Sequence, residues 1–356
     1  MNFQKIVELA LKQGKAKFEE AFNIKYIRFR KDFRKIRRGT VYFPEEGRVV
    51  WGFPKIRRIL CIETGILKNF RGKVAIEEKM DGYNVRVAYI GNNILGITRG
   101  GIICPFTTKF IKKIIPEDFF EEYSRYVICG EVVGNENPYI VYEGIKGLQF
   151  FAFDIMHENE HVKVLQRRDL LESYEIPQVE SFGIFKPKEA VRKLKEVIPK
   201  LNNEKREGVV IKDINMKLQV KYTTSWANNQ NLEYAFSFPF DLGKEFMFRR
   251  IIREGFQAVE FDEDEKMLEE RALKLGRSIL LPLVKSIKQI KHGKELAEKL
   301  CVKCDKATAE ELLNIMRKQG IQIRVNFLND KVIIKKRYQR SSGRLRSLLD
   351  GNFYKD

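Results

Sequence analysis

The sequence predicts an α+β fold with an antiparallel-rich domain in the middle, a small β-containing domain at the N-terminus and a mainly helical region towards the C-terminus. Between residues 72 and 226, short β-branched and aromatic runs alternate with short polar helical stretches. After Tyr222, apolar residues recur at spacings of three and four, the period of an amphipathic helix. The chain has 356 residues, and a domain usually holds roughly 100–200, so we expect several domains.

The composition is strongly basic, with 67 Lys and Arg against 48 Asp and Glu and a formal net charge of +19. Such an excess favours a polyanionic partner, most often nucleic acid or an acidic membrane. A membrane-spanning helix needs roughly 18–20 apolar residues in a row, and no run approaches this length. The five cysteines are odd in number and mostly lie in apolar segments, which favours reduced thiols. We therefore expect a cytoplasmic protein.

The N-terminal domain, which we place at 1–66, begins with a predicted helix over 3–13. Its apolar residues fall on one face, and Gly14 ends the pattern. Residues 25–39 contain eight Lys or Arg and one acid, with aromatic residues between them. This composition suits phosphate binding together with ring stacking. The alternative is a solvated, basic strand pair whose rings face the core.

The middle domain, which we place at 67–235, reads as strands with polar helices between them. A Gly91-Asn92-Asn93 turn predicts a hairpin between two of these strands. The predicted strands are 74–79, 83–90, 93–100, 126–134, 148–156, 207–213 and 217–224. The predicted helices are 105–115, 117–125, 166–174 and 187–201.

The C-terminal region divides into a helical domain at 236–305 and a small basic domain at 306–356. The periodicity predicts long helices over 244–260 and 263–291. A helix over 308–319 and a strand pair around Asn329-Asp330 are predicted after them, followed by a basic tail. The helical domain carries more apolar positions than a lone module needs.

Two patterns in the sequence match metal-binding motifs in their residue types, but we do not expect either to bind a metal. His157 and His161 complete an HExxH pattern, which binds zinc only on a helix, where positions four apart share a face. Here the pattern follows a predicted strand and contains a turn. Cys301 and Cys304 form a CxxC pair without a second pair, which favours packing or incidental spacing over a zinc site. The sequence also has no P-loop pattern for a nucleotide.

The most informative stretch is EEKMDGYNVR, in which Lys79 ends a predicted strand and Asp81 and Gly82 follow at a turn. This arrangement places an amine at the mouth of a pocket, where the glycine lets a phosphate approach the backbone. A lysine amine becomes nucleophilic when neighbouring cations or desolvation lower its pKa. The candidate cations are Lys212 and Lys221.

Further short motifs follow this lysine in a fixed order. They are Arg99-Gly100, Gly130-Glu131, Phe151-Ala152-Phe153-Asp154-Ile155, Glu207-Gly208-Val209-Val210-Ile211-Lys212 and Gln219-Val220-Lys221. Their order and spacing closely resemble the covalent nucleotidyltransferase superfamily, which contains ATP-dependent ligases and messenger-RNA capping enzymes. The resemblance covers residues 72–222 and implies an antiparallel-rich nucleotidyltransferase domain, similar to ATP-grasp ligases.

Within that superfamily, the chain resembles the archaeal homodimeric ATP-dependent RNA ligases. Asn84 and Arg99 follow Lys79 at the spacing found in RNA ligases, and the EEKMDGYNVR and GEVVGNENPY segments and the helical tail match the family layout. The resemblance implies Lys79 as the site of AMP attachment, Glu207 and Asn84 as ligands of Mg²⁺, and Lys221 on the α-phosphate.

The resemblance also implies a larger nucleotide-binding set. It places Glu131 and Arg99 near the ribose, Phe153 on adenine with Asp154 beside it, and Glu77, Glu78, Asp81, Gly82, Asn84, Arg86 and Lys212 around ATP. The catalytic set that it implies is Lys79, Lys221, Glu207 and Asp154. An aromatic face suits a purine, carboxylates suit hydrated Mg²⁺ or ribose hydroxyls, and ammonium groups suit phosphate charge.

The sequence departs from the family pattern at one position. The last motif usually carries two lysines at alternate positions, but the first of them is Gln219 here. Either Lys217 or Lys212 supplies the second cation, or the site works with one fewer. The acidic residue near adenine also stays open, because strand alternation places Glu77 on the side of the nucleophile, whereas related RNA ligases use the adjacent residue, Glu78 here.

We therefore expect an ATP-dependent RNA ligase that works in three steps with ATP and Mg²⁺. Lys79 takes AMP from ATP, the AMP passes to an RNA 5′-phosphate, and a 3′-hydroxyl displaces it to join or circularise the strand. The expected partners are single-stranded RNA, held by the basic terminal segments, and a second copy bound through 236–305. The alternatives are a DNA ligase or an RNA-capping guanylyltransferase, which normally carry an OB-fold, and a non-catalytic nucleic-acid-binding or nucleotide-binding protein.

Overall fold

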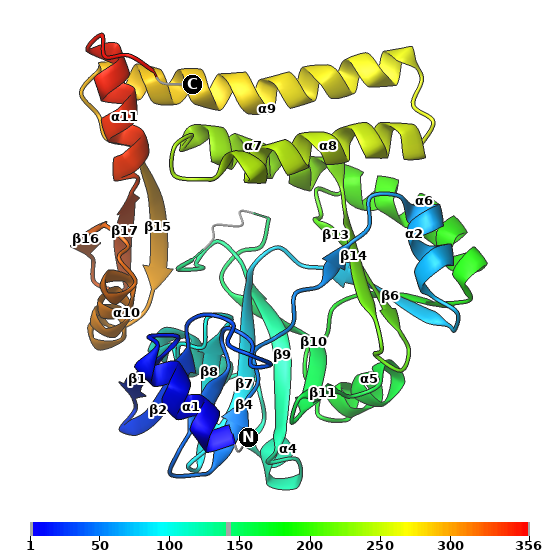
Figure 1. Cartoon of the computed structure of the whole chain (residues 1–356), viewed down its shortest axis with the longest axis vertical. Coiled ribbons are helices and arrows are strands. Elements are labelled where there is room, and N and C mark those ends of the chain that lie inside the picture. The colour runs from blue at the N-terminus through cyan, green and yellow to red at the C-terminus, as the bar shows by residue number, and fades with distance from the viewer. Residues whose placement is uncertain (1–2, 140–143, 355–356) are drawn as a thin grey trace.

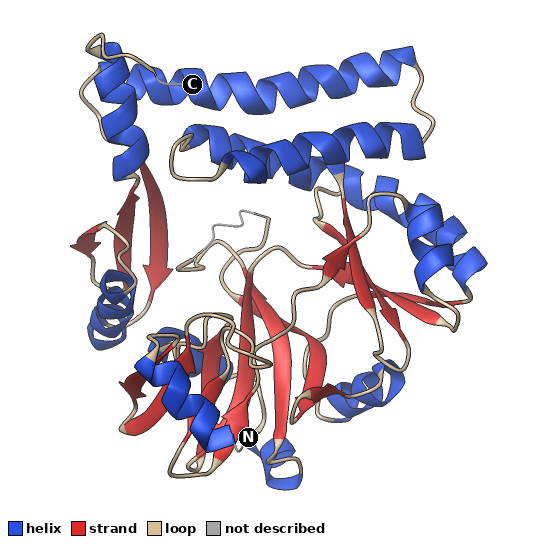
Figure 2. Cartoon of the chain, in the orientation of Figure 1, coloured by secondary structure: helices blue, strands red, loops and turns tan. Residues whose placement is uncertain are grey.

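The computed structural model describes residues 3–139 and 144–354. It has the predicted α+β fold, in which four sheets are flanked by helices and a helical region follows near the C-terminus (Figures 1 and 2). The strand pairs in these sheets are antiparallel, apart from the parallel pair of β14 (Gln219–Thr223) with β5 (Arg57–Arg58).

The N-terminal sheet has the strand order β1-β2-β3-β4, and helix α1 packs on one side of it. The bounds are α1 Phe3–Lys12, β1 Ala16–Ala21, β2 Ile24–Phe29, β3 Val41–Phe43 and β4 Arg48–Val50. The apolar side of α1 packs on Phe29, which confirms the predicted helix over 3–13. Other apolar side chains of this sheet, among them Val41, pack against the middle domain at Ile97.

The first sheet of the middle domain has the order β11-β10-β9-β7-β8. Its strands are β7 Tyr83–Ile90, β8 Asn93–Thr98, β9 Tyr126–Val133, β10 Gln149–His157 and β11 Glu160–His161. Its helices are α3 Pro105–Ile111, α4 Glu117–Glu122 and α5 Val164–Ser173. The predicted hairpin joins β7 to β8. One face packs on the N-terminal sheet, and the other packs on Phe119 and Phe120 of α4.

The second sheet of the middle domain has the order β12-β6-β13-β14-β5. Its remaining elements are β6 Val74–Lys79, β12 Ser181–Phe185, β13 Gly208–Asp213, α2 Ile62–Asn69 and α6 Pro187–Asn203. Helices α2 and α6 cover one face through Ile66 and Leu194, which pack on Ile211. β5 and α2 fall mostly within the 1–66 range of the proposed N-terminal domain, yet both pack on this second sheet.

The helical region consists of α7 Ser225–Ser237, α8 Lys244–Glu260 and α9 Glu265–Lys291. The helices predicted over 244–260 and 263–291 are confirmed. Helix α8 ends on α2, because Glu260 accepts hydrogen bonds from the backbone N–H groups of Ile62, at 2.9 Å, and Glu63, at 3.4 Å. Within the described residues, no helix is long and apolar enough to span a membrane.

A small C-terminal sheet of order β15-β17-β16 follows the long helices. The bounds are β15 Ala297–Lys303, α10 Lys306–Lys318, β16 Ile323–Phe327, β17 Lys331–Arg337 and α11 Gln339–Leu349. The strand pair predicted around Asn329-Asp330 is β16 with β17, whereas β15 lies inside the 236–305 range that we assigned to the helical domain. Helix α10 packs on α3 through Leu312 and Phe106.

Candidate active site

The face of the second sheet that α2 and α6 leave uncovered carries basic residues. In the strand register Gly208 lies opposite Lys79, and Lys221 lies opposite Val210 and beside Arg58. Directly opposed residues on neighbouring strands point to the same side of a sheet. Lys79, Lys221 and Arg58 therefore project from one face.

Lys79 ends β6 as predicted, and its amine is held by Glu207. The Nζ atom lies 2.5 Å from Glu207 Oε2. The backbone fixes this carboxylate, because the N–H of Thr224 donates to the carbonyl oxygen of Glu207 at 2.9 Å. The next residue, Gly208, has a φ of +146°, and a Cβ there would lie 2.3 Å from the carbonyl oxygen of Tyr222. Glycine is thus required to bring Glu207 to the lysine.

The protein's own groups do not activate Lys79. Burial alone favours a lower pKa, but the carboxylates of Glu207, Glu131 and Asp81 outweigh burial and raise the pKa of Lys79. This finding differs from our expectation that nearby lysines lower this pKa. The contact with Glu207 therefore keeps the Lys79 amine protonated and paired.

The carboxylates around Lys79 repel one another. Burial, partly offset by Lys79 and reinforced by Glu207 and Asp81, raises the pKa of Glu131 to about 8. Burial and Glu207 likewise raise the pKa of Asp81 to about 6. Crowded carboxylates with raised pKa values are stabilised when a cation arrives.

Asn84 and Arg99 lie on the first sheet, next to this carboxylate group. Asn84 on β7 is directly opposite Glu131 on β9, so both side chains project from the same face. The Oδ1 atom of Asn84 is buried and accepts no hydrogen bond from the described residues. The N–H of Arg99 donates to the Asn84 carbonyl oxygen at 3.1 Å, which holds the arginine at the end of the same strands. A buried acceptor without a partner is costly, so this position suits a ligand or a hydrated cation.

Lys221 faces other cations. Burial, followed by the charges of Lys79 and Arg58, lowers the pKa of Lys221 to about 8. The amine is therefore a cation below that pH, and an arriving phosphate group stabilises it further.

A second set of predicted residues forms a buried ion-pair network between the two central sheets. Glu77 is 1% exposed and pairs with Arg167, with Arg168 at 3.3 Å and with Lys212 at 2.9 Å. Lys212 Nζ also lies 3.3 Å from Asp154 Oδ1. Burial opposes ionisation of Asp154, but Lys212, His161 and Arg167 together outweigh it and lower the pKa of Asp154 to about 2. Lys212 is thus engaged in ion pairs, away from Lys79.

Phe153 and Gln219 lie beside this network. The Nζ atom of Lys212 donates to the carbonyl oxygen of Phe153 at 2.5 Å, and the half-buried Phe153 ring stands edge-on to Phe53 with centroids 5.3 Å apart. Gln219 Nε2 donates to Asp154 Oδ2 at 3.4 Å. Gln219 therefore supports the network at the position where the motif pattern led us to expect a lysine.

The structure keeps several other predicted residues away from Lys79. Lys217 is exposed in the turn before β14. Glu78 projects from the opposite face to Lys79 and pairs with Arg206 at 2.5 Å. Arg86 is fully buried and donates to the carbonyl oxygens of Trp51, Gly39 and Thr98. Arg86 therefore fastens the N-terminal domain to the first central sheet.

Strand packing requires a glycine at position 82, for a reason that the sequence did not reveal. A Cβ at this position would lie 2.2 Å from the carbonyl oxygen of Val132. The close approach of β9 therefore requires a glycine here, and the expected approach of a phosphate at the same position stays a prediction.

The two histidines of the HExxH pattern lie on a hairpin. His157 ends β10 and His161 ends β11, and the turn between them contains Glu158 with a φ of +53°. This confirms that the pattern is not on a helix. His161 Nδ1 lies 3.4 Å from Asp154 Oδ2, so its partner is a carboxylate of the buried network.

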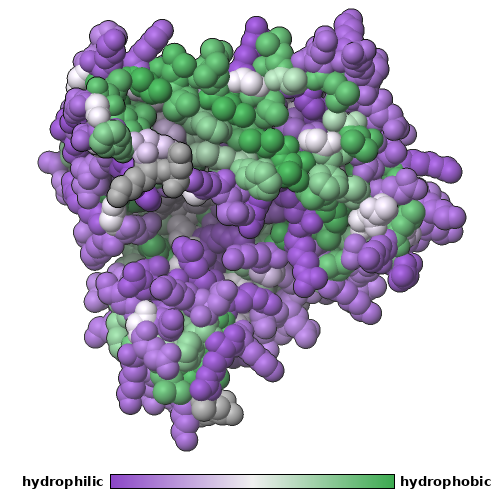
Figure 3. Space-filling model, turned by 45° about the horizontal axis from the view of Figure 1, so that its top comes forward, coloured by the Kyte–Doolittle hydropathy of each residue, from purple (hydrophilic) through white to green (hydrophobic). Residues whose placement is uncertain are grey.

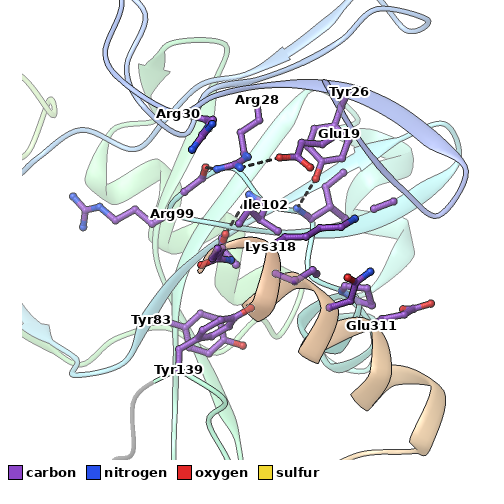
Figure 4. A pocket seen from close by; sticks show the side chains of 18 of the residues that line it. Glu19, Tyr26, Arg28, Arg30, Tyr83, Arg99, Ile102, Tyr139, Glu311 and Lys318 are labelled. Atoms are coloured by element: carbon purple, nitrogen blue, oxygen red, sulfur yellow. Dashed lines mark hydrogen bonds and ion pairs between the residues drawn. The ribbon is translucent and has the colours of Figure 1, made fainter. Parts of the chain in front are cut away.

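A cavity of about 910 Å³ opens next to the carboxylate group (Figure 4). Gly82, Asn84, Arg99 and Glu131 line its inner end. The N-terminal sheet and α10 supply the outer lining, which includes Lys17, Arg28, Arg30, Arg38, Asn314 and Lys318. Figure 4 shows Arg28 and Arg30 at the top of the view, Lys318 near its middle and Tyr83 and Tyr139 towards the bottom. The cavity therefore lies between three parts of the chain, namely the first central sheet, the N-terminal domain and α10.

The chemistry of the donors fits Mg²⁺. The described residues contain no preassembled group of three or more Asp, Glu, His or Cys that could hold a metal. Mg²⁺ is usually held by one or two carboxylates together with substrate phosphates and water. Such a site offers a few oxygen ligands that become more stable when a cation binds. The carboxylates of Glu131 and Asp81, with their raised pKa values, and the unpaired Asn84 Oδ1 fit this description.

The fold and this lysine-centred site define a nucleotidyltransferase of the ligase type. Residues 72–227 match the family model "RNA ligase", and residues 234–352 match the model "Ligase Pab1020 C-terminal region". Two structures of an archaeal ATP-dependent RNA ligase align with a TM-score of 0.94 and 37% identity, over 98% of this chain and 96% of theirs.

Two other relatives cover nearly the whole chain. A protein of Aquifex aeolicus, described provisionally as an ATP-dependent DNA ligase, aligns with a TM-score of 0.91 and 34% identity, over 99% of this chain and 100% of its own. An uncharacterised protein of Methanocaldococcus jannaschii is 37% identical over 94% of this chain and 90% of its own. The chain belongs to the family of ATP-dependent RNA ligases.

Sequence reasoning missed several residues around the site. Arg167 holds Glu77 from helix α5, and its only signal is an Arg-Arg pair in a polar helix. Arg58 lies in β5, which has two residues and gives no periodicity. Arg250 and Arg253 lie on α8, for which the sequence analysis predicted only a helix and gave no role to the basic residues.

Proposed function

We propose that this protein is an ATP-dependent RNA ligase that forms a lysyl-AMP intermediate on Lys79, adenylates an RNA 5′-phosphate and joins it to a 3′-hydroxyl. The observation that carries the proposal is the placement of Lys79 beside Glu207, with Lys221 on the same sheet face. A lysine that ends a strand within a cluster of carboxylates and cations suits covalent attack on a phosphorus atom.

In the proposed first step, the Lys79 amine attacks the α-phosphorus of ATP. The N–P bond forms while the bond to the pyrophosphate oxygen breaks, and pyrophosphate leaves with that electron pair. The proton of the amine passes to solvent. Mg²⁺ would be held by Glu207 and Asn84 and would supply positive charge that neutralises the phosphates. Lys221 stabilises the charge that develops on the α-phosphate.

The remaining nucleotide contacts stay proposals. Glu131 and Arg99 suit the ribose, because they lie at the end of the first sheet next to Asn84. The buried network of Glu77, Lys212 and Asp154 holds β10 and β13 together and so positions Phe153, which suits stacking on adenine. In this proposal Glu77 and Asp154 position their neighbours, and Glu78 has no contact with ATP.

Intact-mass spectrometry tests the first step. Purified protein is stripped of any bound AMP with pyrophosphate, and ATP and Mg²⁺ are then added to the wild type and to Lys79→Ala. We expect a single AMP adduct on the wild type and none on the variant. Absence of the adduct from the wild type would favour a nucleotide-binding protein without this chemistry.

The cavity beside the site suits single-stranded RNA. Its outer lining combines Lys17, Arg28, Arg30 and Arg38 of the N-terminal domain, which are suited to backbone phosphates. Binding by phosphate contacts weakens steeply with salt, and several contacts lower the affinity by orders of magnitude between about 50 and 200 mM. Filter binding at a series of salt concentrations checks this, and salt-independent binding contradicts it.

RNA and DNA need separate tests, because one relative is described as an RNA ligase and another provisionally as a DNA ligase. The region after the middle domain consists of long helices and a three-stranded sheet, which differs from the OB-fold usual in DNA ligases and capping enzymes. We expect sealing of 5′-phosphorylated single-stranded RNA with ATP, and much less sealing of nicked DNA or use of GTP.

The helical region supports a homodimer. Exposed apolar side chains gather on α8 and α9, and Figure 3 shows them as a continuous green area over these helices. They are Phe248, Ile252, Phe256, Val259, Met267, Leu268, Leu273, Leu280, Leu281 and Val284. An apolar area this extended is unusual on a monomer, and a second copy of the same surface covers it by two-fold pairing. A cytoplasmic location also stays a proposal, supported by the free state of the five cysteines.

A further inference from the structure

Three arginines from distant parts of the chain converge beside Lys221. Arg58 on β5 is next to Lys221 in the register, and its Nη1 atom donates to Thr223 Oγ1 at 2.7 Å. Arg253 of α8 lines a small hollow together with Arg58 and Thr223. Arg250 lies one helical turn before Arg253 on the same side of α8. The helical region therefore brings its own basic groups to the edge of the catalytic sheet.

These arginines are not neutralised by ion pairs. Among the described residues, no carboxylate lies within ion-pair distance of Arg58, Arg250 or Arg253, whereas the neighbouring Arg249 pairs with Glu245 at 3.2 Å. Arg250 donates to Asn231 Oδ1 at 3.1 Å and to the carbonyl oxygen of Phe246, and its buried Nε atom has no partner.

The charges of this cluster act on one another. Burial and the charge of Arg253 lower the pKa of Arg58 to about 10, and burial followed by Arg253 and Arg58 lowers the pKa of Arg250 to about 9. Burial lowers the pKa of Arg253 as well, although Glu207 acts in the opposite direction. Cations forced together without a counter-ion favour an anion that binds all of them.

We propose that Arg58, Arg250 and Arg253 bind the β- and γ-phosphates of ATP and hold pyrophosphate as it leaves. The inference rests on the proposed adenylation of Lys79. Across the sheet the strands follow in the order β6, β13, β14 and β5. Lys79 lies on β6, Lys221 on β14 and Arg58 on β5. With the α-phosphate at Lys221, in-line attack by Lys79 directs the leaving group towards β5 and α8. The planar guanidinium groups are suited to two-point contact with phosphate oxygens.

The bond that breaks leaves its electrons on the pyrophosphate oxygen, so negative charge grows on the group that these arginines contact. Donors placed where charge develops lower the barrier more than they strengthen ground-state binding. The same residues act in reverse when pyrophosphate removes AMP from the lysine. They have no role in the last step, in which RNA ends are joined and no pyrophosphate is involved.

Separate measurement of the steps tests this assignment. Arg250→Ala, Arg253→Ala and the double variant are compared with Arg249→Ala, which removes a charge from the same helix but leaves the cluster intact. We expect single-turnover adenylation with ATP to slow about 10- to 100-fold, as for loss of a charged hydrogen bond. We also expect the pyrophosphate concentration needed to remove AMP from the adduct to rise by about tenfold or more. Sealing of pre-adenylated RNA and the behaviour of Arg249→Ala remain as in the wild type.

Three results overturn the inference. If adenylation and its dependence on pyrophosphate are unchanged in the variants, the arginines do not bind the β- and γ-phosphates. If RNA binding and sealing of pre-adenylated RNA are lost to the same extent as adenylation, the cluster binds RNA phosphates instead. Absence of an adduct on the wild type removes the proposed function itself, and the inference falls with it. If an alanine variant unfolds, as judged by circular dichroism, Arg250→Lys and Arg253→Lys are used in its place. Lysine retains the charge but lacks the planar guanidinium group, so we expect a smaller loss in the same steps.

Discussion

Lys79 and Glu207 form an ion pair of 2.5 Å that joins the expected nucleophile to the expected metal ligand. While this pair persists, the amine stays protonated, because Glu207 and the neighbouring carboxylates raise its pKa against the effect of burial. A cation bound by Glu207 would free the amine from this pair. We therefore expect metal binding and activation of Lys79 to be coupled through this one contact.

Replacement of Glu207 separates these two effects. We expect Glu207→Gln to lower the pKa of Lys79, because the largest opposing charge is removed, while AMP-adduct formation slows about 100-fold or more through loss of the metal contact. The rate of Lys79 acetylation, followed by peptide mass spectrometry from pH 6 to 10 without ATP, reports this pKa. The exposed Lys68 in the same digests is the internal control, and an unchanged Lys79 midpoint contradicts the prediction.

The lowered pKa of Lys221 predicts that the affinity for ATP falls in alkaline solution. Burial, Lys79 and Arg58 lower its pKa to about 8, so the amine is charged below that pH and loses its charge above it. The affinity for α,β-methylene ATP, measured by calorimetry with Mg²⁺, is expected to fall about tenfold between pH 7 and 9. Lys221→Arg keeps its charge and should abolish this fall. Lys217→Arg, in the exposed turn nearby, should retain it.

Glu131 predicts that removal of a carboxylate stabilises the protein in alkaline solution. Its pKa is about 8 in the folded chain against an ordinary value of 4.5 for a glutamate, so the unfolded state releases the proton first. Stability is therefore lost as pH rises from 4.5 to 8. Glu131→Gln abolishes this loss and should raise the free energy of unfolding by up to about 4 kcal/mol at pH 8 and by less than about 1 kcal/mol at pH 5. Denaturant unfolding without nucleotide or metal checks this, with the exposed Glu121→Gln as control.

Arg167 is expected to matter for stability more than its neighbour. Its side chain is 0% exposed and pairs with Glu77, whereas the side chain of Arg168 is 28% exposed. Arg167→Leu leaves a buried carboxylate short of a partner, which costs about 3–5 kcal/mol. Arg168→Leu should cost less than about 1 kcal/mol. Thermal unfolding of the two variants distinguishes them, and equal effects would refute the buried-network interpretation.

The apolar surface of α8 and α9 predicts the oligomeric state. Leu280 and Leu281 are 58% and 59% exposed, and a charged residue there opposes burial in an interface. We expect the wild type to sediment at about twice the chain mass, and Leu280→Glu or Leu281→Glu to sediment as a monomer of 41.9 kDa. Leu165→Glu introduces the same change on α5 at 52% exposure and should leave the dimer intact. A wild-type monomer at all concentrations would exclude this interface.

The sequence alone was sufficient to predict the strands and helices whose apolar residues follow a clear pattern. The short runs at 74–79 and 83–90 predict β6 and β7 at their observed bounds, and spacings of three and four predict α8 and α9. β5 has two residues, so no period can form, and its place beside β14 depends on packing of α2. β15 was missed because its partner, β17, follows later in the chain.

The candidate site could be predicted as a set of residues, but not as a set of contacts. The motif order placed Lys79 and Glu207 in one site, and the structure brings them together. It gave no sign that Lys212 is neutralised by Glu77, because the pairing partners come from different strands and the network is completed by Arg167 of α5. Arg86 lies within a nucleotide-binding motif and yet is used for packing between domains, a choice that depends on Trp51 and Gly39.

The hydrogen bonds from Ile62 and Glu63 to Glu260 have a mechanical consequence. They fasten the end of α8 to the first turn of α2, and Gln257 adds a bond to the carbonyl oxygen of Thr223 at 3.4 Å. These contacts anchor the helical region to the catalytic sheet. We therefore expect the two to move as one unit, so that exchange of ATP, pyrophosphate and RNA ends depends on movements of side chains and loops.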